Sequence, residues 1–202
     1  MTNHGNRSKC RAAIEHSYLS ESELLDVGIQ TVGTNVRISE ACTIMGVENI
    51  RIGDNVIIDA GVVINCKTGS ITIGNHVHLA SGCYLSGSGT IVLSDFCGLA
   101  SGARIYSATD DYMGETLTNP TVPEEFVGVK YAPVHLGKHV IIGSGTVVLP
   151  GCSIGEGSSV GALSLVTTAL DSWGVFCGIP ARRLKERSRK LLELERLLVQ
   201  RG

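Results

Sequence analysis

Aromatic side chains are scarce in this sequence, at only 4% of its 202 residues. A core with so few aromatic rings must be filled by aliphatic side chains, and 43% of the residues are apolar. Glycine is abundant by contrast, with 25 copies, which favours many tight bends. These proportions predict one compact domain whose core is a stack of Ile, Val and Leu side chains.

Other absences exclude whole classes of function. No apolar run approaches the roughly 18 residues needed to cross a membrane, so we expect no membrane insertion. The formal net charge of -2 provides no basic field for nucleic acid, so we expect no nucleic-acid partner. Residues Met1 to Arg11 are polar and lack the apolar stretch of a secretion signal, which predicts a cytoplasmic protein.

The dominant pattern is a period of six. Between Ile38 and Val166 an aliphatic residue recurs every six positions, usually followed by a small residue four places later. The repeating positions are Ile38 and Ile44, then Ile52, Ile58 and Ile64, then Ile73, Leu79 and Leu85, then Leu93, Leu99 and Ile105, then Leu136, Ile142 and Val148, and finally Ile154, Val160 and Val166. This period fits neither an amphipathic helix nor a simple strand. It is typical of an all-β solenoid, a parallel β-helix in which three six-residue faces close a triangular coil and coils stack about 4.8 Å apart.

Glycine directly follows the aliphatic residue at several repeats, where we expect the chain to bend at a corner that disfavours a Cβ. These glycines are Gly53, Gly74, Gly137, Gly143, Gly155 and Gly161. Of the seven cysteines, four occupy the small position four residues after an aliphatic: Cys42, Cys83, Cys97 and Cys152. There a thiol acts as a compact apolar filler, and an odd cysteine count without a secretion signal fits a reducing compartment. Cys10, Cys66 and Cys177 have no assigned position and are expected to be free thiols.

Two segments break the repeat. Ile105 and Leu136 are 31 residues apart where the pattern asks for six, so residues 107–132 are predicted to leave the wall as an extended loop. This loop contains acidic residues, among them Asp110 and Asp111, and loops inserted in a solenoid usually carry its function. After Gly178-Ile179-Pro180, residues Arg182 to Gln200 have a rough apolar stripe that predicts a helix.

The predicted organisation therefore has three parts. Residues 1–35 form an N-terminal flank with a short helix, which Ser20 caps ahead of the acidic first turn. Residues 36–180 form the β-helix with the inserted loop, and residues 181–202 form a C-terminal α-helix.

Four stretches carry a family resemblance: residues 136–143 (LGKHVIIG), 149–155 (LPGCSIG), 160–167 (VGALSLVT) and 178–181 (GIPA). Together they resemble the hexapeptide-repeat acyltransferases, in particular the sugar O-acetyltransferases and the N-acetyltransferases of nucleotide-linked amino sugars in surface-polysaccharide pathways. The resemblance covers nearly the whole chain. It implies a left-handed β-helix, a homotrimer with active sites between neighbouring subunits, and acetyl-CoA as the donor.

The same resemblance suggests where the coenzyme binds. The positions that match the coenzyme groove of the family are Ser144, Ala162, Thr167, Thr168, Arg182 and Lys185. Their backbone would hold the pantetheine arm, while the cations would meet phosphate groups. Thr168 stands where the family commonly has a lysine, so this chain departs from the family at one phosphate contact.

The start of the long loop departs from the sugar O-acetyltransferase pattern, which places a histidine there. Here the stretch is Ser107-Ala108-Thr109-Asp110-Asp111-Tyr112. A sugar hydroxyl needs a general base whose pKa lies near the working pH, whereas an amine with a pKa of about 8 is already partly nucleophilic. The stretch is similar to the Thr-Asn-Asp of some nucleotide-sugar N-acetyltransferases. We therefore expect N-acetylation of an amino-deoxysugar carried on a nucleoside diphosphate, with Asp110 or Asp111 orienting the amine and accepting a proton.

Three alternatives remain open at the level of sequence. His135 precedes an inward aliphatic and should face outward; as a general base it would restore a sugar O-acetyltransferase. Some trimers of this type hydrate carbon dioxide with zinc bound by histidines of neighbouring subunits, and the pairs His76 with His78 and His135 with His139 could serve there. The predicted function itself requires no metal. A non-catalytic scaffold trimer is the third alternative.

Overall fold

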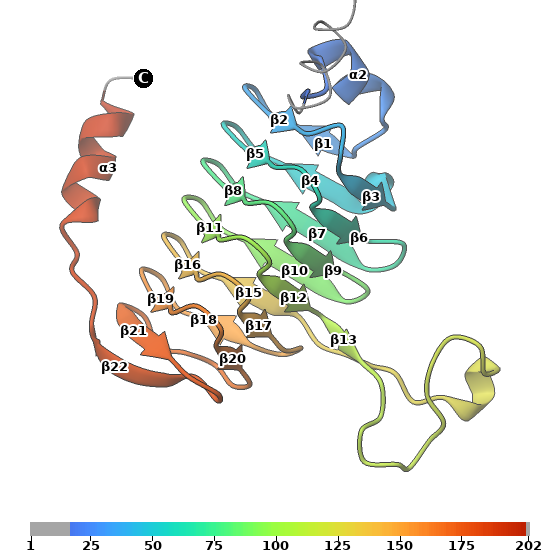
Figure 1. Cartoon of the computed structure of the whole chain (residues 1–202). Coiled ribbons are helices and arrows are strands. Elements are labelled where there is room, and N and C mark those ends of the chain that lie inside the picture. The colour runs from blue at the N-terminus through green and yellow to red at the C-terminus, as the bar shows by residue number, and fades with distance from the viewer. Residues whose placement is uncertain (1–16, 201–202) are drawn as a thin grey trace, which may run out of the picture.

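The computed structural model describes residues 17–200. Three parallel sheets form the walls of a triangular stack of coils (Figure 1). The first sheet contains β1 (Thr31–Val32), β4 (Ile50–Ile52), β7 (Ser70–Ile73), β10 (Thr90–Leu93), β15 (Val134–Leu136) and β18 (Ser153–Ile154). The second contains β2 (Arg37–Ile38), β5 (Ile57–Ile58), β8 (His78–Leu79), β11 (Gly98–Leu99), β16 (Ile141–Ile142), β19 (Ser159–Val160), β21 (Gly174–Cys177) and β22 (Arg182–Glu186). The third contains β3 (Thr43–Met45), β6 (Val63–Asn65), β9 (Tyr84–Ser86), β12 (Arg104–Tyr106), β17 (Val147–Val148) and β20 (Leu165–Val166).

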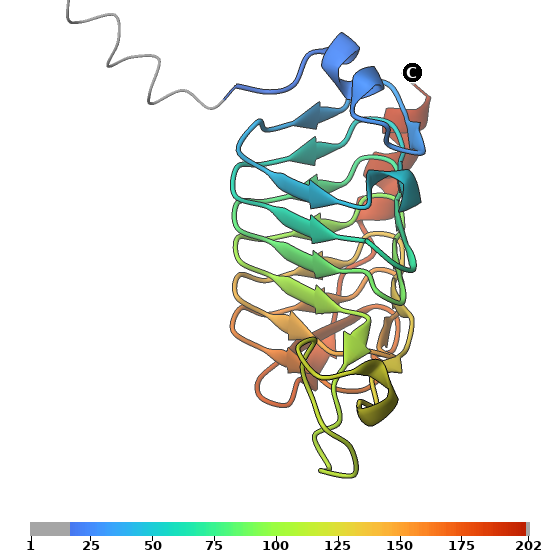
Figure 2. The same ribbon diagram turned by 90° about the vertical axis from the view of Figure 1, so that its right-hand side faces the viewer.

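Each coil visits the three sheets in turn and then rises to the next coil, as Figure 2 shows along the side of the stack. We call the bend between the first and second sheets the first corner, that between the second and third sheets the second corner, and that between the third and first sheets the third corner. The predicted left-handed parallel β-helix is confirmed. Its first strand begins at Thr31, before the boundary expected at residue 36.

The repeating aliphatic residues point inward, as predicted. Ile58, Leu79, Leu99, Ile142 and Val160 form one inward column of the second sheet, and none of them is more than 2% exposed. Because each side chain packs on the corresponding residue of the coils above and below, the core is a continuous rod of branched aliphatics.

The glycines that follow the aliphatic residues serve a different purpose from the one expected. Gly53 and Gly74 are not in the left-handed region; that conformation is adopted two residues later, by Asn55 and His76, with φ of 56° and 55°. A Cβ on Gly53 would lie 2.9 Å from the backbone carbon of Gly74 in the next coil. Glycine is needed there because successive coils approach each other closely, not because the backbone bends.

Side chains at the first corner also join the coils. The Asp54 carboxylate accepts a hydrogen bond from the Thr34 backbone amide at 2.6 Å, and the Asn75 side-chain oxygen accepts one from the Asp54 amide at 2.8 Å. Asp95 continues the ladder by accepting from the Asn75 amide at 2.7 Å. These side chains satisfy backbone donors that the turn leaves without a strand partner.

The N-terminal prediction is confirmed within the described residues. Helix α2 (Glu21–Asp26) is capped by Ser20, whose hydroxyl accepts from the Glu23 amide at 3.3 Å while the Glu23 carboxylate accepts from the Ser20 amide at 2.7 Å. Leu24 of this helix is buried at the open end of the first coil. Short 3-10 helices follow at η1 (Val47–Asn49) and, within the long loop, at η2 (Glu124–Phe126).

The C-terminal prediction was wrong over its first half. Arg182–Glu186 is strand β22, which pairs antiparallel with β21, and helix α3 begins only at Leu191 and ends at Val199. The edge of the last coil carries unpaired backbone groups, and β22 satisfies them by folding back across this edge. Pairing with an edge outweighed the helical pattern, and Leu184 of the expected stripe is 65% exposed.

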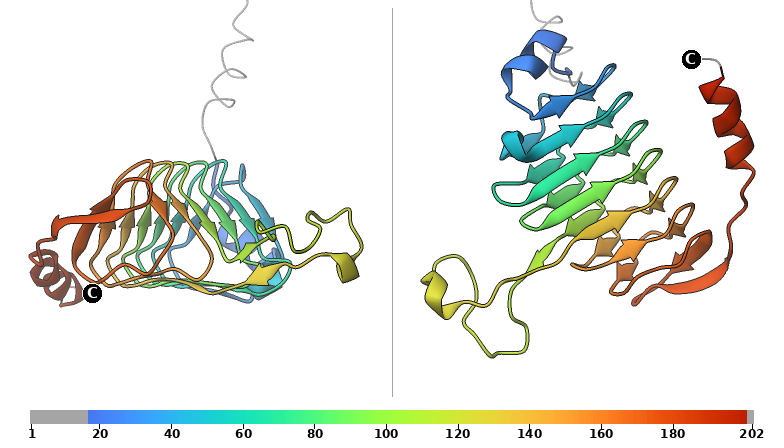
Figure 3. Two further views of the ribbon diagram at one scale, coloured as in Figure 1. Left: turned by 90° about the horizontal axis from the view of Figure 1, so that it is seen from below. Right: turned by 180° about the vertical axis from the view of Figure 1, so that it is seen from behind.

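The long loop leaves the stack at the third corner and returns through a small antiparallel pair, β13 (Ala108–Thr109) with β14 (Lys130–Tyr131). Figure 3 shows the loop and α3 on opposite sides of the stack. No helix within residues 17–200 is long and apolar enough to cross a membrane.

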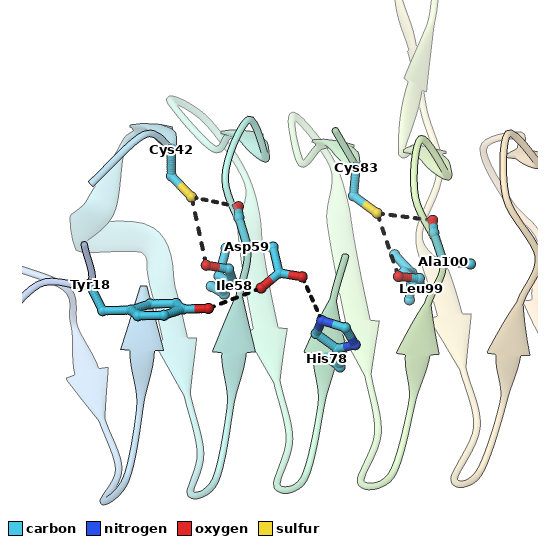
Figure 4. A network of polar contacts seen from close by, with 8 residues as sticks. All are labelled: Tyr18, Cys42, Ile58, Asp59, His78, Cys83, Leu99 and Ala100. Atoms are coloured by element: carbon cyan, nitrogen blue, oxygen red, sulfur yellow. Dashed lines mark hydrogen bonds and ion pairs between the residues drawn. The ribbon is translucent and has the colours of Figure 1, made fainter. Parts of the chain in front are cut away.

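The cysteines fill small positions, as expected. Cys83, Cys97 and Cys152 are buried and Cys42 is half-buried, and all four are free thiols. Their sulfurs donate to carbonyl oxygens of the next coil, for example from Cys42 to Asp59 at 3.0 Å and from Cys83 to Ala100 at 3.3 Å (Figure 4). Cys66 is buried and Cys177 is half-buried, whereas Cys10 lies outside the described residues.

Truncating one residue of the core should destabilise the whole stack. We expect Leu99→Ala to lower the free energy of unfolding by about 3 kcal/mol, because it leaves a cavity in a column that cannot collapse. Leu25→Ala is the matched control; Leu25 is 81% exposed, and its loss should change the free energy by less than about 0.5 kcal/mol. Urea unfolding followed by circular dichroism measures both, and equal effects would contradict the inward assignment.

The buried thiols should resist alkylation. Burial raises the pKa of Cys83 to about 11 and that of Cys97 to about 12, so both remain protonated at pH 8 and are poor nucleophiles. Brief treatment with iodoacetamide at pH 8, read by peptide mass spectrometry, should modify Cys177 before either of them. In denaturant all three should react alike, and native labelling of Cys97 as fast as Cys177 would refute the assignment.

Candidate active site

The root of the long loop is fixed to the coil at the third corner. Ser107 is fully buried, and its hydroxyl donates to the Ser86 carbonyl at 2.8 Å and accepts from the Gly89 amide at 3.0 Å. The Ala132 amide donates to the Ser107 carbonyl at 3.0 Å, which closes the loop where it returns. The residues just beyond Ser107 therefore leave the coil from a rigid base.

Asp111 organises the first turn of the loop. Its carboxylate accepts hydrogen bonds from the backbone amides of Met113 at 2.8 Å, Glu115 at 2.6 Å and Thr116 at 2.7 Å, and from the Thr116 hydroxyl at 3.3 Å. These bonds, the one from Met113 first, lower the pKa of Asp111 below its usual range. Asp111 is thus held as an anion at neutral pH and is a poor proton acceptor.

Asp110 has a different environment although it is the adjacent residue. Its side chain is exposed and lines an open hollow of about 500 Å³ under the loop. Ser88, Asn119, Glu124 and Tyr131 line the same hollow. Of the two aspartates, Asp110 is therefore the one whose carboxylate can reach a bound molecule in this hollow, which Glu124 also lines. Asn119 and Tyr131 were not identified as site residues from the sequence. Their position in a long inserted loop is the one signal in the sequence that pointed to them.

His135 faces outward from β15, as predicted. Its neighbours in register are Val92 on β10 and Ser153 on β18. The imidazole forms no hydrogen bond or ion pair with any other residue in the range 17–200, including Asp110 and Asp111. Within one protomer the structure does not bring this histidine together with the loop carboxylates.

Four of the predicted coenzyme positions lie at the two ends of the last strands of the third sheet. Ser144 and Ala162 are exposed at the second corner, where the Leu163 amide donates to the Ser144 carbonyl at 2.9 Å. Thr167 and Thr168 are exposed at the third corner, after β20. Leu163 itself was missed; it has φ of 55° and is 72% exposed beside these small residues.

The two predicted cations lie on β22. Its pairing puts Arg182 opposite Cys177, near the second corner, and Lys185 opposite Val175, about 10 Å away by the rise of a strand. The turn before Arg182 is tied to the third sheet, because the Ala181 amide donates to the Leu165 carbonyl at 2.8 Å. Arg182 and Lys185 are both exposed; Arg182 lies at the end of the corner that contains Ser144 and Ala162, whereas Lys185 lies nearer the first corner.

The other three histidines of the coils have protein partners within the protomer. His78 contacts the Asp59 carboxylate at 2.9 Å, and the Tyr18 hydroxyl donates to the other oxygen of Asp59 at 3.3 Å (Figure 4). His76 stacks on Phe96 with ring centroids 4.7 Å apart, and His139 contacts Glu195 at 2.8 Å. Among residues 17–200 no three His, Cys, Asp or Glu side chains gather closely enough to hold a metal ion.

Comparison with known proteins agrees with this architecture. Residues 133–168 match the family described as bacterial transferase hexapeptide (six repeats). The chain is 41% identical over 179 residues to the dTDP-4-amino-4,6-dideoxy-D-glucose acyltransferase of Escherichia coli, which covers 89% of this chain and 93% of that protein. The galactoside O-acetyltransferase of Escherichia coli K12 is 29% identical over 85% of this chain and 72% of its own length.

Among solved structures the chain is similar to AntD, an N-acyltransferase from Bacillus cereus. The complex of AntD with dTDP and 3-hydroxybutyryl-CoA has a TM-score of 0.87 at 39% identity and covers 92% of this chain and 98% of its own. A variant of AntD bound to dTDP-4-amino-4,6-dideoxyglucose and coenzyme A has a TM-score of 0.89. With a relative this similar over nearly the full length of both chains, the protein belongs to the hexapeptide-repeat acyltransferases.

Proposed function

We propose that this chain transfers the acetyl group of acetyl-CoA to the amino group of an amino-deoxysugar linked to dTDP. The observation that carries the proposal is the 41% identity, over 89% of the chain, to an acyltransferase named for dTDP-4-amino-4,6-dideoxy-D-glucose. The AntD complexes, which hold the same class of nucleotide sugar together with coenzyme A, support it. The loop start supports it too, since it offers aspartates and no histidine to an acceptor.

The chemistry requires orientation more than activation. The free amine attacks the thioester carbonyl, a C–N bond forms and the C–S bond breaks. The nitrogen of the new C–N bond carries a positive charge and loses a proton, and the departing CoA thiolate gains one. The products are an amide and a thiol. Asp110 orients the amine from the hollow and accepts this proton transiently. Asp111 stays ionised and maintains the conformation of the loop. Backbone amides of the coil stabilise the oxyanion.

The coenzyme would lie along the second corner and the end of the third sheet. Ser144 and Ala162 are small and exposed, so an extended pantetheine arm could approach the backbone there without a bulky side chain intervening. Thr167 and Thr168 lie at the opposite edge of the same sheet. Arg182 and Lys185, at the end of this surface, would pair with phosphate groups of the coenzyme. These residues fit an elongated, anionic co-substrate.

A homotrimer would complete the site. Several large apolar side chains of the loop are exposed in the protomer: Tyr112 at 90%, Met113 at 81%, Leu117 at 59% and Phe126 at 55%. An apolar surface of this kind is usually covered by a partner. The loop leaves the third corner whereas Ser144 and Ala162 lie at the second, so Asp110 would meet a thioester bound on a neighbouring copy.

The cellular setting is proposed on the same basis. Free thiols at the buried core positions fit the reducing cytoplasm, where acetyl-CoA and nucleotide sugars are available. An acylated dTDP-sugar is an activated glycosyl donor, and the chain would therefore supply a surface-polysaccharide pathway such as that of lipopolysaccharide or capsule.

The class of acceptor can be tested directly. Release of thiol from acetyl-CoA should be measured with dTDP-4-amino-4,6-dideoxyglucose and with the matched dTDP-sugar that has a hydroxyl at the same carbon. We expect turnover of the amine at least about 100-fold faster, because the site lacks the base that a hydroxyl requires. Turnover of the hydroxy sugar alone would refute N-acetylation.

The roles of the loop carboxylates can be separated by substitution. Asp110→Asn should lower kcat about 100-fold without lowering the melting temperature, because the Asp110 side chain is exposed and its carboxylate forms no hydrogen bond or ion pair within residues 17–200. Asp111→Asn should loosen the loop and raise the KM for the nucleotide sugar. His135→Ala serves as a comparison and should stay within about twofold of the wild type. Loss of turnover only in His135→Ala would contradict the assignment.

A further inference from the structure

The segment that follows β22 attaches the C-terminus to the first corner at two points. Figure 1 shows β22 crossing under the last coil and α3 turning back along the side of the stack. The first attachment is made by Arg187, directly after β22, and the second by Glu195, in the middle of α3. Neither residue stands out in the sequence, where both lie in a run of charged side chains.

Arg187 joins successive coils through one guanidinium group. Its Nη1 atom donates to the carbonyl oxygens of His139 at 2.7 Å, Gly157 at 3.0 Å and Ser158 at 3.3 Å. Its backbone amide donates to the Trp173 carbonyl at 2.7 Å. The side chain is half-buried, and this burial lowers the pKa of Arg187, which is nonetheless far too basic to lose its charge.

Glu195 makes the second attachment. Its carboxylate accepts from His139 Nε2 at 2.8 Å and forms an ion pair with Lys138. The hydrogen bond from Lys138, and after it that from His139, lowers the pKa of Glu195. The His139 ring is itself fixed, because it stacks on Phe96 with centroids 4.9 Å apart. Glu195 therefore binds a rigid part of the coil.

Backbone pairing with β21 holds β22, and the two attachments fix the segment that directly follows it. Strand β22 lies at the edge of its sheet, and its register with β21 shifts between Val175 and Phe176. All five of its residues are exposed, so side-chain packing contributes little to holding it. Lys185 is two residues from Arg187. A change at Arg187 would move Lys185 relative to the coil, whereas the bond from the Ala181 amide to the Leu165 carbonyl holds the turn before Arg182.

From this geometry we infer that Arg187 and Glu195 are positioning residues, which hold β22 where its cations bind the phosphates of the coenzyme. Neither residue touches the reactants. The inference rests on the proposed function. Through this positioning, Arg187 and Glu195 enable the enzyme to distinguish acetyl-CoA from the analogue that lacks the 3′-phosphate.

The test measures kcat and KM for acetyl-CoA and for 3′-dephospho-acetyl-CoA in the full-length protein. The variants are Arg187→Ala, Arg187→Lys and Glu195→Gln. Glu193→Gln is the matched control, because Glu193 is exposed on the same helix and its carboxylate forms no hydrogen bond or ion pair within the described residues. Circular dichroism and the melting temperature report whether each variant folds.

We expect the wild type to prefer acetyl-CoA about tenfold or more, since charge-assisted contacts to one phosphate are worth this much. Arg187→Ala should raise the KM for acetyl-CoA about tenfold and bring the preference close to one, while kcat and the KM for the nucleotide sugar stay within twofold. Arg187→Lys and Glu195→Gln should give smaller shifts in the same direction. A single ammonium group cannot span the three carbonyls, and an amide cannot form the ion pair.

Several results would overturn the inference. It would be overturned if Arg187→Lys and Glu195→Gln left unchanged both the KM for acetyl-CoA and the preference for acetyl-CoA over 3′-dephospho-acetyl-CoA. This holds even where Arg187→Ala fails to fold. A parallel fall in kcat with both donors would indicate general damage and would also contradict it. A wild type that acylates the sugar without distinguishing the two donors removes the inference but leaves the proposed function standing. A wild type that acylates no nucleotide sugar removes the proposed function itself.

Discussion

The contact on which this molecule depends is the close approach of one coil to the next. Backbone amides of each coil donate to carbonyls of its neighbour, as from Arg104 to Thr146 at 2.8 Å and from Gly53 to Ile73 at 2.8 Å. This spacing leaves no room for a Cβ at Gly53 and fixes the inward direction of every sixth aliphatic. Because the wall has no spare backbone group, extra chain can leave it only at a corner. The long loop does so at the third corner, and β22 closes the last edge.

The six-residue period was sufficient to predict the coil, the inward columns and the place of the insertion. These features follow from local geometry that repeats, so each coil supplies independent evidence for the same arrangement. The C-terminus has no repeat to support it. There Leu184, Leu191 and Leu194 suggested one continuous helix, but the unpaired edge of β21 captured the first residues as a strand. Competition between local pattern and an open sheet edge is decided by tertiary contacts, which the sequence does not display.

The candidate site was predictable only in part, for a related reason. The sequence placed Ser144 and Ala162 on the coil, because the repeat fixes their register. It marked Arg182 and Lys185 as cations, but it could not show that these two face solvent while Arg187 faces the coil. That distinction arises from three carbonyl oxygens of two different coils. Their convergence on one point depends on how the chain folds back.

The two loop aspartates show how strongly the backbone decides chemistry. Asp110 and Asp111 are chemically identical neighbours, and sequence reasoning could not separate their roles. In the structure three amides converge on Asp111 and hold it ionised, whereas Asp110 projects into the hollow. One carboxylate thus maintains the loop so that the other can meet a substrate. An amine acceptor suits this division, because it requires a well-placed anion and no base of neutral pKa.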